Sequence, residues 1–207
     1  MIKISPSILN AKNRIESVTK LNNTNADFLH IDVMDGKFVN NIQFSQEEID
    51  KIEKISKIPL DIHLMVENPE NYIENLTNKN VEFITFHIEI NKDINKIINL
   101  IKSLGYKVGI SLKPNTKVDS LIPYIKNIDL VLIMSVEPGY GGQEFIPSSL
   151  DKAEEIRKLN HNLIIEIDGG IKDTNIKEIK KYVDIAVVGS YITNNENYNQ
   201  AINNLKN

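Results

Sequence analysis

Cysteine is absent from this chain of 207 residues. Its absence excludes disulfide bonds, thiolate metal ligands and a cysteine nucleophile. No apolar run approaches the length of a membrane span, and the N-terminus leads directly into a strand-like segment rather than a signal peptide. We therefore expect a cytoplasmic protein with no membrane partner.

Clusters of basic residues are also missing. The chain has 24 Lys and Arg residues against 28 Asp and Glu residues, which gives a net charge of −4. This balance argues against nucleic acid as a partner. The hydrophobic fraction of 41% and the charged fraction of 25% are ordinary for a soluble globular protein, and the length is sufficient for one well-buried domain.

Strand-like and helix-like segments alternate along the whole chain, without a linker or a change in composition. The strand-like segments cover residues 2–9, 28–33, 59–66, 81–88, 107–112, 130–136, 163–167 and 185–188. Between them the apolar residues have helical spacing, most clearly from Ile94 to Leu104, where Gly105 ends the pattern. The alternation predicts an α/β fold with parallel strands, and eight such units close most naturally as a single-domain (β/α)8 TIM barrel over residues 1–207. An open doubly wound sheet is the alternative.

Two polar side chains interrupt the apolar strand over residues 28–33. His30 and Asp32 are two residues apart, so they lie on the same face of the strand. An imidazole and a carboxylate are costly to bury unless something pairs or ligates them. They form either a hydrogen-bonded pair in the core or half of a metal site.

Further candidate ligands follow on two other strand-like segments. His63 lies on the segment over residues 59–66, and the segment over residues 163–167 leads directly into Asp168. Two imidazoles and two carboxylates suit a divalent ion such as Zn, Fe, Mn or Co. Because the active site of a barrel lies at the C-terminal ends of its strands, we expect one divalent metal ion per subunit, bound by His30, Asp32, His63 and Asp168.

Glycines gather after the last three strand-like segments. They lie in Gly139-Tyr140-Gly141-Gly142, in Gly169-Gly170 and in Gly189-Ser190. Glycines let backbone N–H groups converge on an anion, and barrels often bind phosphate with the loops after the seventh and eighth strands. One such loop alone would indicate only a turn, whereas three on adjacent units predict a phosphate pocket.

Other side chains at the same strand ends have two interpretations each. Met34, Met65 and Met134 either fill the core or form an apolar wall that excludes water from the metal. Ser7 either contacts a substrate oxygen or caps the following turn. For His87 we expect a role behind a metal ligand or toward the substrate.

Five segments together resemble the signature segments of the ribulose-phosphate 3-epimerase family. They cover residues 4–9, 30–39, 63–66, 136–143 and 168–171, and they occur in the order typical of the family. The resemblance implies a metal-dependent isomerase of carbohydrate metabolism that interconverts D-ribulose 5-phosphate and D-xylulose 5-phosphate in the pentose phosphate pathway. Its partner would be a small-molecule sugar phosphate. We also expect a homo-oligomer, with which apolar faces on the outer helices would be compatible.

The resemblance also implies roles for single residues. It places the metal on the four candidate ligands and makes Asp32 and Asp168 the catalytic acid/base pair, acting through an enediolate. The implied substrate contacts are Ser7, His63, Gly139, Tyr140, Gly141, Gly142, Gly169, Gly170, Gly189 and Ser190. The chain departs from the usual family pattern at Asn40, where Pro is common, and at Ser45-Gln46, near which Gly-Pro is common.

Two other functions stay open at this point. The nearest is 3-epimerisation of a ketohexose phosphate such as allulose 6-phosphate, although Asp168-Gly169-Gly170 and the pair Gly141-Gly142 favour the pentose enzyme. The other is a non-catalytic sugar-phosphate sensor on the same barrel. A complete ligand set with both carboxylates argues against a sensor, which would need neither.

Overall fold

A computed structural model of the chain describes residues 1–76 and 80–207. Its strands form one sheet in the order β1-β9-β8-β7-β6-β5-β4-β2-β3. Their bounds are β1 (Lys3–Pro6), β2 (Leu29–Asp35), β3 (Ile42–Gln43), β4 (Leu60–Met65), β5 (Val81–His87), β6 (Lys107–Leu112), β7 (Leu130–Met134), β8 (Ile164–Asp168) and β9 (Ile185–Val188). Neighbouring strands pair in parallel, except that β3 pairs antiparallel with β2.

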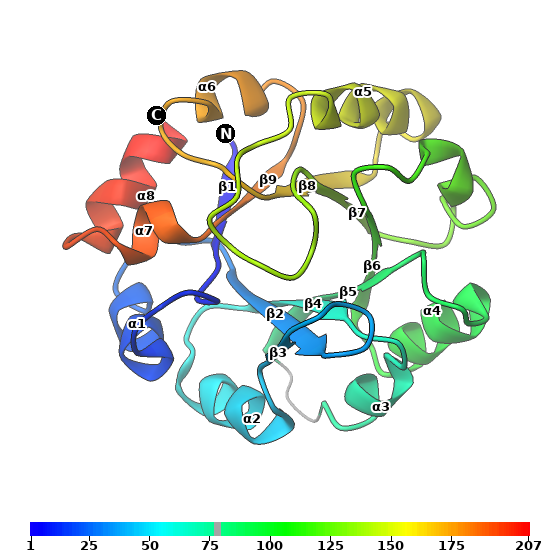
Figure 1. Cartoon of the computed structure of the whole chain (residues 1–207), viewed down its shortest axis with the longest axis horizontal. Helices are drawn as coiled ribbons and strands as arrows, with labels where there is room; N and C mark the ends of the chain where they lie inside the picture. Colours follow the sequence, from blue (N-terminus) through cyan, green and yellow to red (C-terminus); the bar gives the residue numbers. More distant parts are fainter. Residues whose placement is uncertain (77–79) are drawn as a thin grey trace.

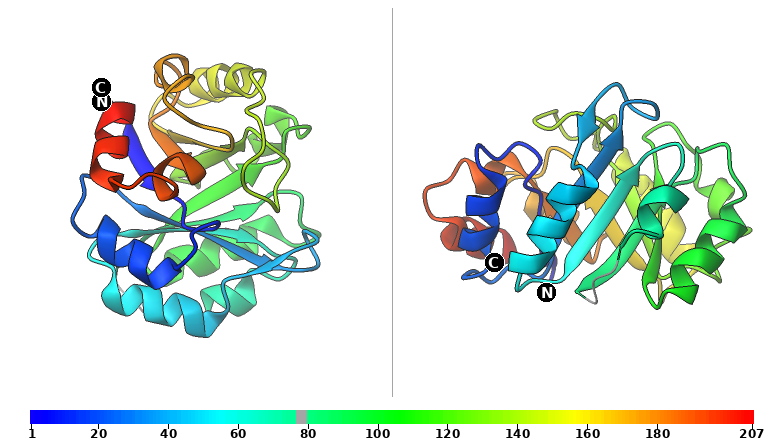
Figure 2. Two further views of the ribbon diagram at one scale, coloured as in Figure 1. Left: turned by 60° about the vertical axis from the view of Figure 1, so that its left-hand side comes forward. Right: turned by 90° about the horizontal axis from the view of Figure 1, so that it is seen from below.

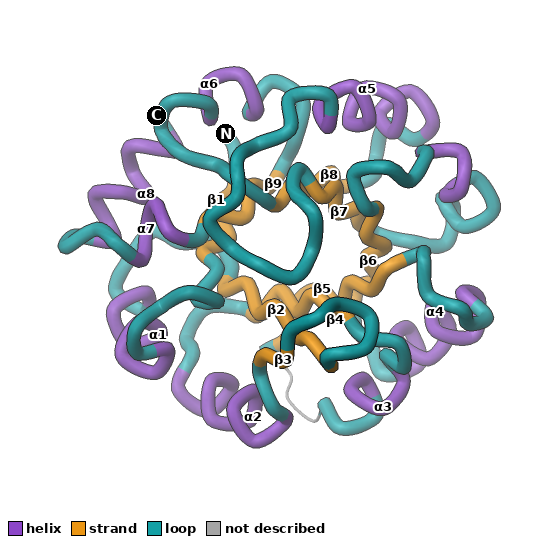
Figure 3. The backbone as a smooth tube through the Cα atoms, in the orientation of Figure 1, coloured by secondary structure: helices purple, strands orange, loops and turns teal. Residues whose placement is uncertain are grey.

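The sheet closes on itself between β1 and β2. A parallel bridge joins Ser7 to His30, and the backbone N–H groups of Asp27 and Phe28 donate to the carbonyl oxygen of Ile4. The strands therefore surround a common axis (Figure 1, Figure 3). This closure confirms the predicted (β/α)8 barrel and excludes the open doubly wound sheet. We call this junction the β1–β2 seam.

Helices surround the barrel on its outer face (Figure 1). Their bounds are α1 (Arg14–Leu21), α2 (Gln46–Ile55), α3 (Glu70–Ile73), α4 (Ile94–Ser103), the 3-10 helix η1 (Val118–Leu121), α5 (Ser149–Leu159), α6 (Ile176–Ile179), α7 (Ser190–Thr193) and α8 (Tyr198–Lys206). In α4 the four isoleucines at helical spacing, Ile94, Ile97, Ile98 and Ile101, are buried, and Asp93 caps the N-terminus. Among the described residues, none of the helices has the length and apolarity to cross a membrane.

Two short elements are not predicted by the sequence pattern. Strand β3 has two residues, and it forms a hairpin with the end of β2 that projects beyond the barrel (Figure 2). Helix α7 has four residues and directly follows β9. Neither is long enough to show a hydrophobic period.

The barrel interior is apolar at one end and polar at the other. Where the strands begin, it is filled by Phe28, Phe83, Leu130 and Ile185, and the two phenylalanine rings meet edge to face with centroids 5.4 Å apart. Further along the strands, buried polar side chains replace them, including His30, Asp61 and His63. Because strand residues alternate between faces, polar residues at period two on several strands meet inside the barrel at its C-terminal end.

Candidate active site

The four predicted metal ligands converge at the C-terminal end of the barrel. His30 and Asp32 come from β2, His63 from β4 and Asp168 from the end of β8, and one donor atom from each lies within 4.8 Å of the others. Asp32 and His63 are direct neighbours in the register of β2 and β4. Asp32 Oδ1 lies 3.2 Å from His30 Nε2 and 3.2 Å from His63 Nδ1. The strand register therefore assembles the set.

This cluster fits a divalent ion. Protein ligands lie about 2.0–2.2 Å from zinc, so donor atoms roughly 3–4 Å apart can share one ion. His30 Nε2 is fully buried and makes no hydrogen bond to any described residue. An unpartnered, buried ring nitrogen beside a carboxylate is costly unless a cation lies there. The donor set of two imidazoles and two carboxylates suits a transition-metal ion.

Asp61 orients His30 from behind. Its Oδ2 lies 2.6 Å from His30 Nδ1 and also accepts a hydrogen bond of 2.9 Å from Ser5 Oγ. Because a carboxylate oxygen with these partners accepts, Nδ1 carries a hydrogen. Burial would lower the pKa of His30, but the Asp61 and Asp32 carboxylates outweigh it and raise that pKa well above its ordinary value, which favours the protonated ring. A metal ion bound at Nε2 would replace that proton. Sequence reasoning missed Asp61, although its position two residues before His63 places it on the same inward face.

Glu166 is a second buried acid that sequence reasoning missed. It is fully buried, lies two residues before Asp168 on β8, and shares a cluster with His30 and Asp61. Burial raises the pKa of Glu166 well above its ordinary value, and the neighbouring Asp61 carboxylate raises it further. These shifts favour the neutral acid form of Glu166, whereas His30 lowers the pKa of Asp61 and favours its carboxylate form.

The two candidate acid/base groups have different protonation states. Burial would raise the pKa of Asp32, but the positive charge of the neighbouring His30 outweighs it and holds that pKa below its ordinary value. Burial and the nearby charge of Asp32 raise the pKa of Asp168 to about 7. Ser7 Oγ donates a 2.7 Å hydrogen bond to Asp32 Oδ2 and so also holds the ionised form. Two carboxyl groups with separated pKa values are typical of a base and an acid.

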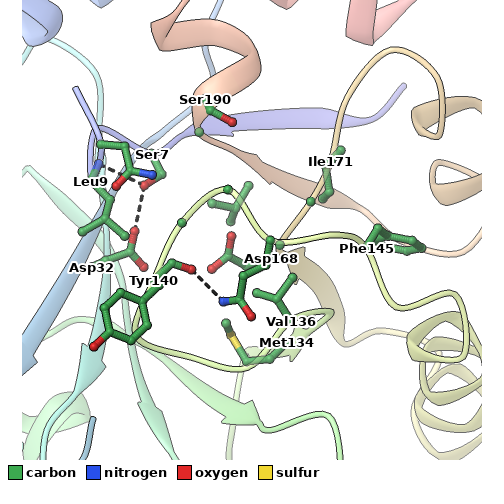
Figure 4. Close-up of a pocket in the computed structure, with 18 of the residues that line it drawn as sticks. Ser7, Leu9, Asp32, Met134, Val136, Tyr140, Phe145, Asp168, Ile171 and Ser190 are labelled. Atoms are coloured by element: carbon green, nitrogen blue, oxygen red, sulfur yellow. Dashed lines mark hydrogen bonds between the residues drawn. The ribbon is translucent and has the colours of Figure 1, made fainter. Parts of the chain in front are cut away.

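A cavity of about 740 Å³ lies above the cluster (Figure 4). Its lining includes Asp32 and Asp168 and all three predicted methionines. Every predicted substrate contact except His63 also lines it. These contacts are Ser7, Gly139, Tyr140, Gly141, Gly142, Gly169, Gly170, Gly189 and Ser190. His30 and His63 are fully buried beneath it. The burial of His63 does not support the predicted substrate contact, because the side chain does not line the cavity.

The lining also includes Asn10, Lys172 and Asn175, which sequence reasoning missed because they lie in loops without a motif.

The three predicted methionines lie at the cavity. Met34, Met65 and Met134 are 2%, 1% and 2% exposed and line it. Their thioethers are apolar and deformable. This placement is compatible with the apolar wall, which stays a prediction.

Two loops on the cavity rim are tied together. Ser135 Oγ, just after β7, contacts the backbone oxygens of Asp168 and Gly169, each at 2.8 Å. Gly170 has a φ of +64°, and a Cβ at this position would lie 2.4 Å from the backbone nitrogen of Phe145. The loop after β8 therefore packs on the loop after β7 with no room for a side chain.

Gly170→Ala tests this close approach. The left-handed backbone alone should lower the free energy of unfolding by roughly 1–3 kcal/mol, and the clash with the Phe145 backbone should add to that loss. Gly105→Ala is the matched control, because Gly105 has a φ of +86° but nothing within 4 Å of a Cβ. Urea unfolding of both variants measures the difference, and equal losses would contradict the packing described here.

The sequence comparison decides the family. Residues 3–193 match the model of the ribulose-phosphate 3 epimerase family. The chain belongs to the ribulose-phosphate 3-epimerase family. It is therefore an isomerase of the epimerase type, as its sequence motifs predict.

Curated members of the epimerase family align with most or all of the chain. The ribulose-phosphate 3-epimerase of Helicobacter pylori strain J99 is 39% identical over 216 residues, which cover 100% of this chain and 97% of that protein. The Bacillus subtilis enzyme is 36% identical and covers 100% of this chain, with 99% of that protein aligned. The Aquifex aeolicus enzyme is 43% identical over 172 residues, or 81% of this chain and 78% of that protein.

Solved structures of other enzymes share the fold. KGPDC from Streptococcus mutans superposes with a TM-score of 0.74 at 11% identity, over 100% of this chain and 96% of that one. A 3-hexulose-6-phosphate synthase superposes with a TM-score of 0.70 at 13% identity, over 99% of this chain and 98% of that one. At such low identity these likenesses show the fold alone.

The departures from the epimerase pattern have local structural explanations. Ser45 caps α2 by accepting a hydrogen bond from the backbone N–H of Glu48, and Gln46 is the first residue of that helix. Proline is favoured at this first helical position, so either residue suits it. Asn40 offers its carbonyl oxygen to Tyr140 Oη at 3.0 Å, a contact that proline could also accept. Neither departure alters a predicted ligand.

Proposed function

We propose that this chain interconverts D-ribulose 5-phosphate and D-xylulose 5-phosphate by moving a proton at C3. Asp32 and Asp168 are the two acid/base groups, and His30, Asp32, His63 and Asp168 hold one divalent ion of Zn, Fe, Mn or Co. The observation that carries the proposal is geometric: two carboxyl groups, Asp32 and Asp168, line one cavity and belong to the ligand cluster beneath it. The family membership supports the same reaction.

The C3 proton of a 2-ketopentose phosphate is only weakly acidic. When bound, the divalent ion supplies positive charge that stabilises the negative charge developing on the C2 oxygen. Burial of the site beside the three methionines strengthens this electrostatic effect, since water is excluded.

Inversion at C3 needs a base on one face of the substrate and an acid on the other. Asp32 comes from β2 and Asp168 from β8, and strands β1 and β9 separate them around the barrel. In one direction ionised Asp32 removes the C3 proton, and protonated Asp168 gives its proton to the opposite face. In the other direction the roles are exchanged. The hydrogen bond from Ser7 Oγ holds the Asp32 carboxylate in place for this transfer.

The phosphate occupies the glycine-rich part of the cavity. Gly141, Gly142, Gly170 and Gly189 line it and have no side chains of their own. Their N–H groups can approach an anion closely. A phosphate fixed there would hold C3 between the two carboxyl groups and so lower the entropy cost of reaction.

The test is proton NMR of ribulose 5-phosphate in D2O with the metal-loaded protein. We expect deuterium to enter at C3 while xylulose 5-phosphate forms, and a chelator to abolish both. Exchange without inversion would disprove the two-base scheme. No exchange with any of the four metals, followed by turnover of allulose 6-phosphate, would assign the hexose reaction; no turnover of either sugar would favour a sensor.

The homo-oligomer and the cytoplasmic location stay predictions. Exposed apolar side chains on the outer helices, such as Ile15, Leu104 and Leu159, are compatible with association. Light scattering of the purified protein would test the oligomer.

A further inference from the structure

His63 is held by hydrogen bonds that lead away from the ligand cluster. Its Nε2 lies 3.0 Å from His87 Nε2, and His87 Nδ1 lies 2.9 Å from Glu89 Oε2. The rings of His63 and His87 are both fully buried, whereas the Glu89 side chain is 19% exposed. The three side chains form a continuous row from the cluster to the barrel rim, which we call the His63–His87–Glu89 row.

Glu89 can only accept hydrogen bonds in this arrangement. Besides His87, the backbone N–H of Lys113 donates to Glu89 Oε1 at 2.7 Å, and Thr116 Oγ1 donates to the same oxygen. Three donors around one carboxyl group are satisfied by an ionised carboxylate. The outer end of the row is therefore a fixed acceptor.

A fixed acceptor at one end sets the direction of every hydrogen bond in the row. His87 Nδ1 must carry the hydrogen that Glu89 accepts. A neutral, fully buried imidazole with a hydrogen on Nδ1 has a bare Nε2. That bare Nε2 can only accept, so His63 must donate from its own Nε2. His63 Nδ1 is then bare, and it faces Asp32 Oδ1 at 3.2 Å.

Three candidate metal-binding atoms converge inside the cluster. They are His63 Nδ1, His30 Nε2 and the Asp32 Oδ1 that lies 3.2 Å from each. Asp61 orients the His30 ring directly, and Glu89 sets the His63 tautomer through one intervening ring. Partners behind the ligating side chains that fix ring orientation and tautomer favour metal binding.

We infer that Glu89 is a positioning residue of the metal site, which acts through His87 to keep His63 Nδ1 bare toward the ligand cluster. This inference rests on the proposed metal site and extends it beyond the four ligands. Glu89 itself touches neither the cluster nor the cavity lining.

The test compares Zn²⁺ affinity among the wild-type protein, Glu89→Gln and Glu82→Gln, by competition with a colorimetric chelator. Glutamine keeps the size of Glu89 and an acceptor for Lys113, but its amide group can also donate to His87 Nδ1. The hydrogen bonds of the row are then no longer fixed in one direction. We expect the Zn²⁺ affinity to fall by about 10–100-fold. Glu82 is the control, because it lies on β5, the strand that ends two residues before Glu89, but pairs with Lys107 at 2.5 Å, away from the row.

Nitrogen-15 NMR of the imidazoles in the metal-free wild-type protein tests the inference without a variant. We expect hydrogen on Nε2 of His63 and on Nδ1 of His87. Hydrogen on Nδ1 of His63, or a Glu89→Gln protein that binds Zn²⁺ within twofold of wild type, would overturn the inference and leave the metal site intact. A wild-type protein that binds no divalent ion would overturn the metal site and the inference together.

Discussion

Asp168→Asn is expected to lower the turnover of ribulose 5-phosphate by about 10²–10⁴-fold, the usual contribution of a general acid–base group. Asparagine has the size of aspartate and keeps one oxygen toward the cluster, but it cannot accept or give the C3 proton. With Asp32 intact, one epimer should still exchange its C3 hydrogen with D2O, whereas the other should not. In Asp32→Asn the other epimer should exchange its C3 hydrogen with D2O, and the first should not.

Exchange of the C3 hydrogen in each epimer distinguishes the loss of the acid/base group from the loss of the metal ion. Loss of metal would remove exchange from both epimers, and metal content measured on the same sample would reveal it. Asp119→Asn is the control, because Asp119 is an exposed residue of η1 and should leave turnover unchanged. Near-normal turnover in both Asp168→Asn and Asp32→Asn would rule out the two-base scheme.

Removal of the metal by chelation should abolish epimerisation and lower the melting temperature. An ion present at 1,000 times its dissociation constant stabilises a folded protein by about 4 kcal/mol. For a chain of this length, each kcal/mol changes the melting temperature by roughly 2–4 °C, so we expect a fall of roughly 8–16 °C. The physical reason is the convergence of one His30 nitrogen, one His63 nitrogen and the Asp32 carboxylate, which a bound cation would link.

Calorimetric scans with and without chelator measure this shift, with activity assayed on the same samples. His63→Gln is the comparison variant, because it loses a ring nitrogen of the cluster and should show a smaller shift on chelation. Restoring Zn, Fe, Mn or Co singly would show which ion restores turnover. A wild-type protein with unchanged melting temperature and turnover after its metal is removed would contradict the assigned ligand set.

Much of the barrel and the ligand set follows from the sequence because strand periodicity is local. His30 and Asp32 share a face whatever lies beside them, and alternating units leave few ways to close the sheet. The strand ends then bring Asp168 to the same rim. These inferences need only the two-residue alternation of side chains along a strand and the alternation of strands with helices. They do not need the register between neighbouring strands.

The supporting acids could not be predicted in the same way. Asp61 meets His30 because the two are direct neighbours in the register of β2 and β4, across 31 positions of sequence. Glu89 acts through His87 only because the loop with Lys113 and Thr116 closes over its carboxylate. The hydrophobic pattern of the sequence contains no information on contacts between side chains that lie on different strands or loops. Strand β3 and helix α7 escaped prediction because they are too short to show a period.

The β1–β2 seam has a consequence for the order of folding. Ser7 and His30 form the bridge that closes the barrel, and Ser7 also donates to Asp32 across the same junction. The first and second strands must therefore be docked before the cluster has its final form. A chain whose barrel is still open cannot hold the ion or orient Asp32, so closure of the barrel and the onset of catalytic competence become one kinetic event. The rate at which activity appears during refolding should then equal the rate at which the amide hydrogens along this junction become protected from solvent.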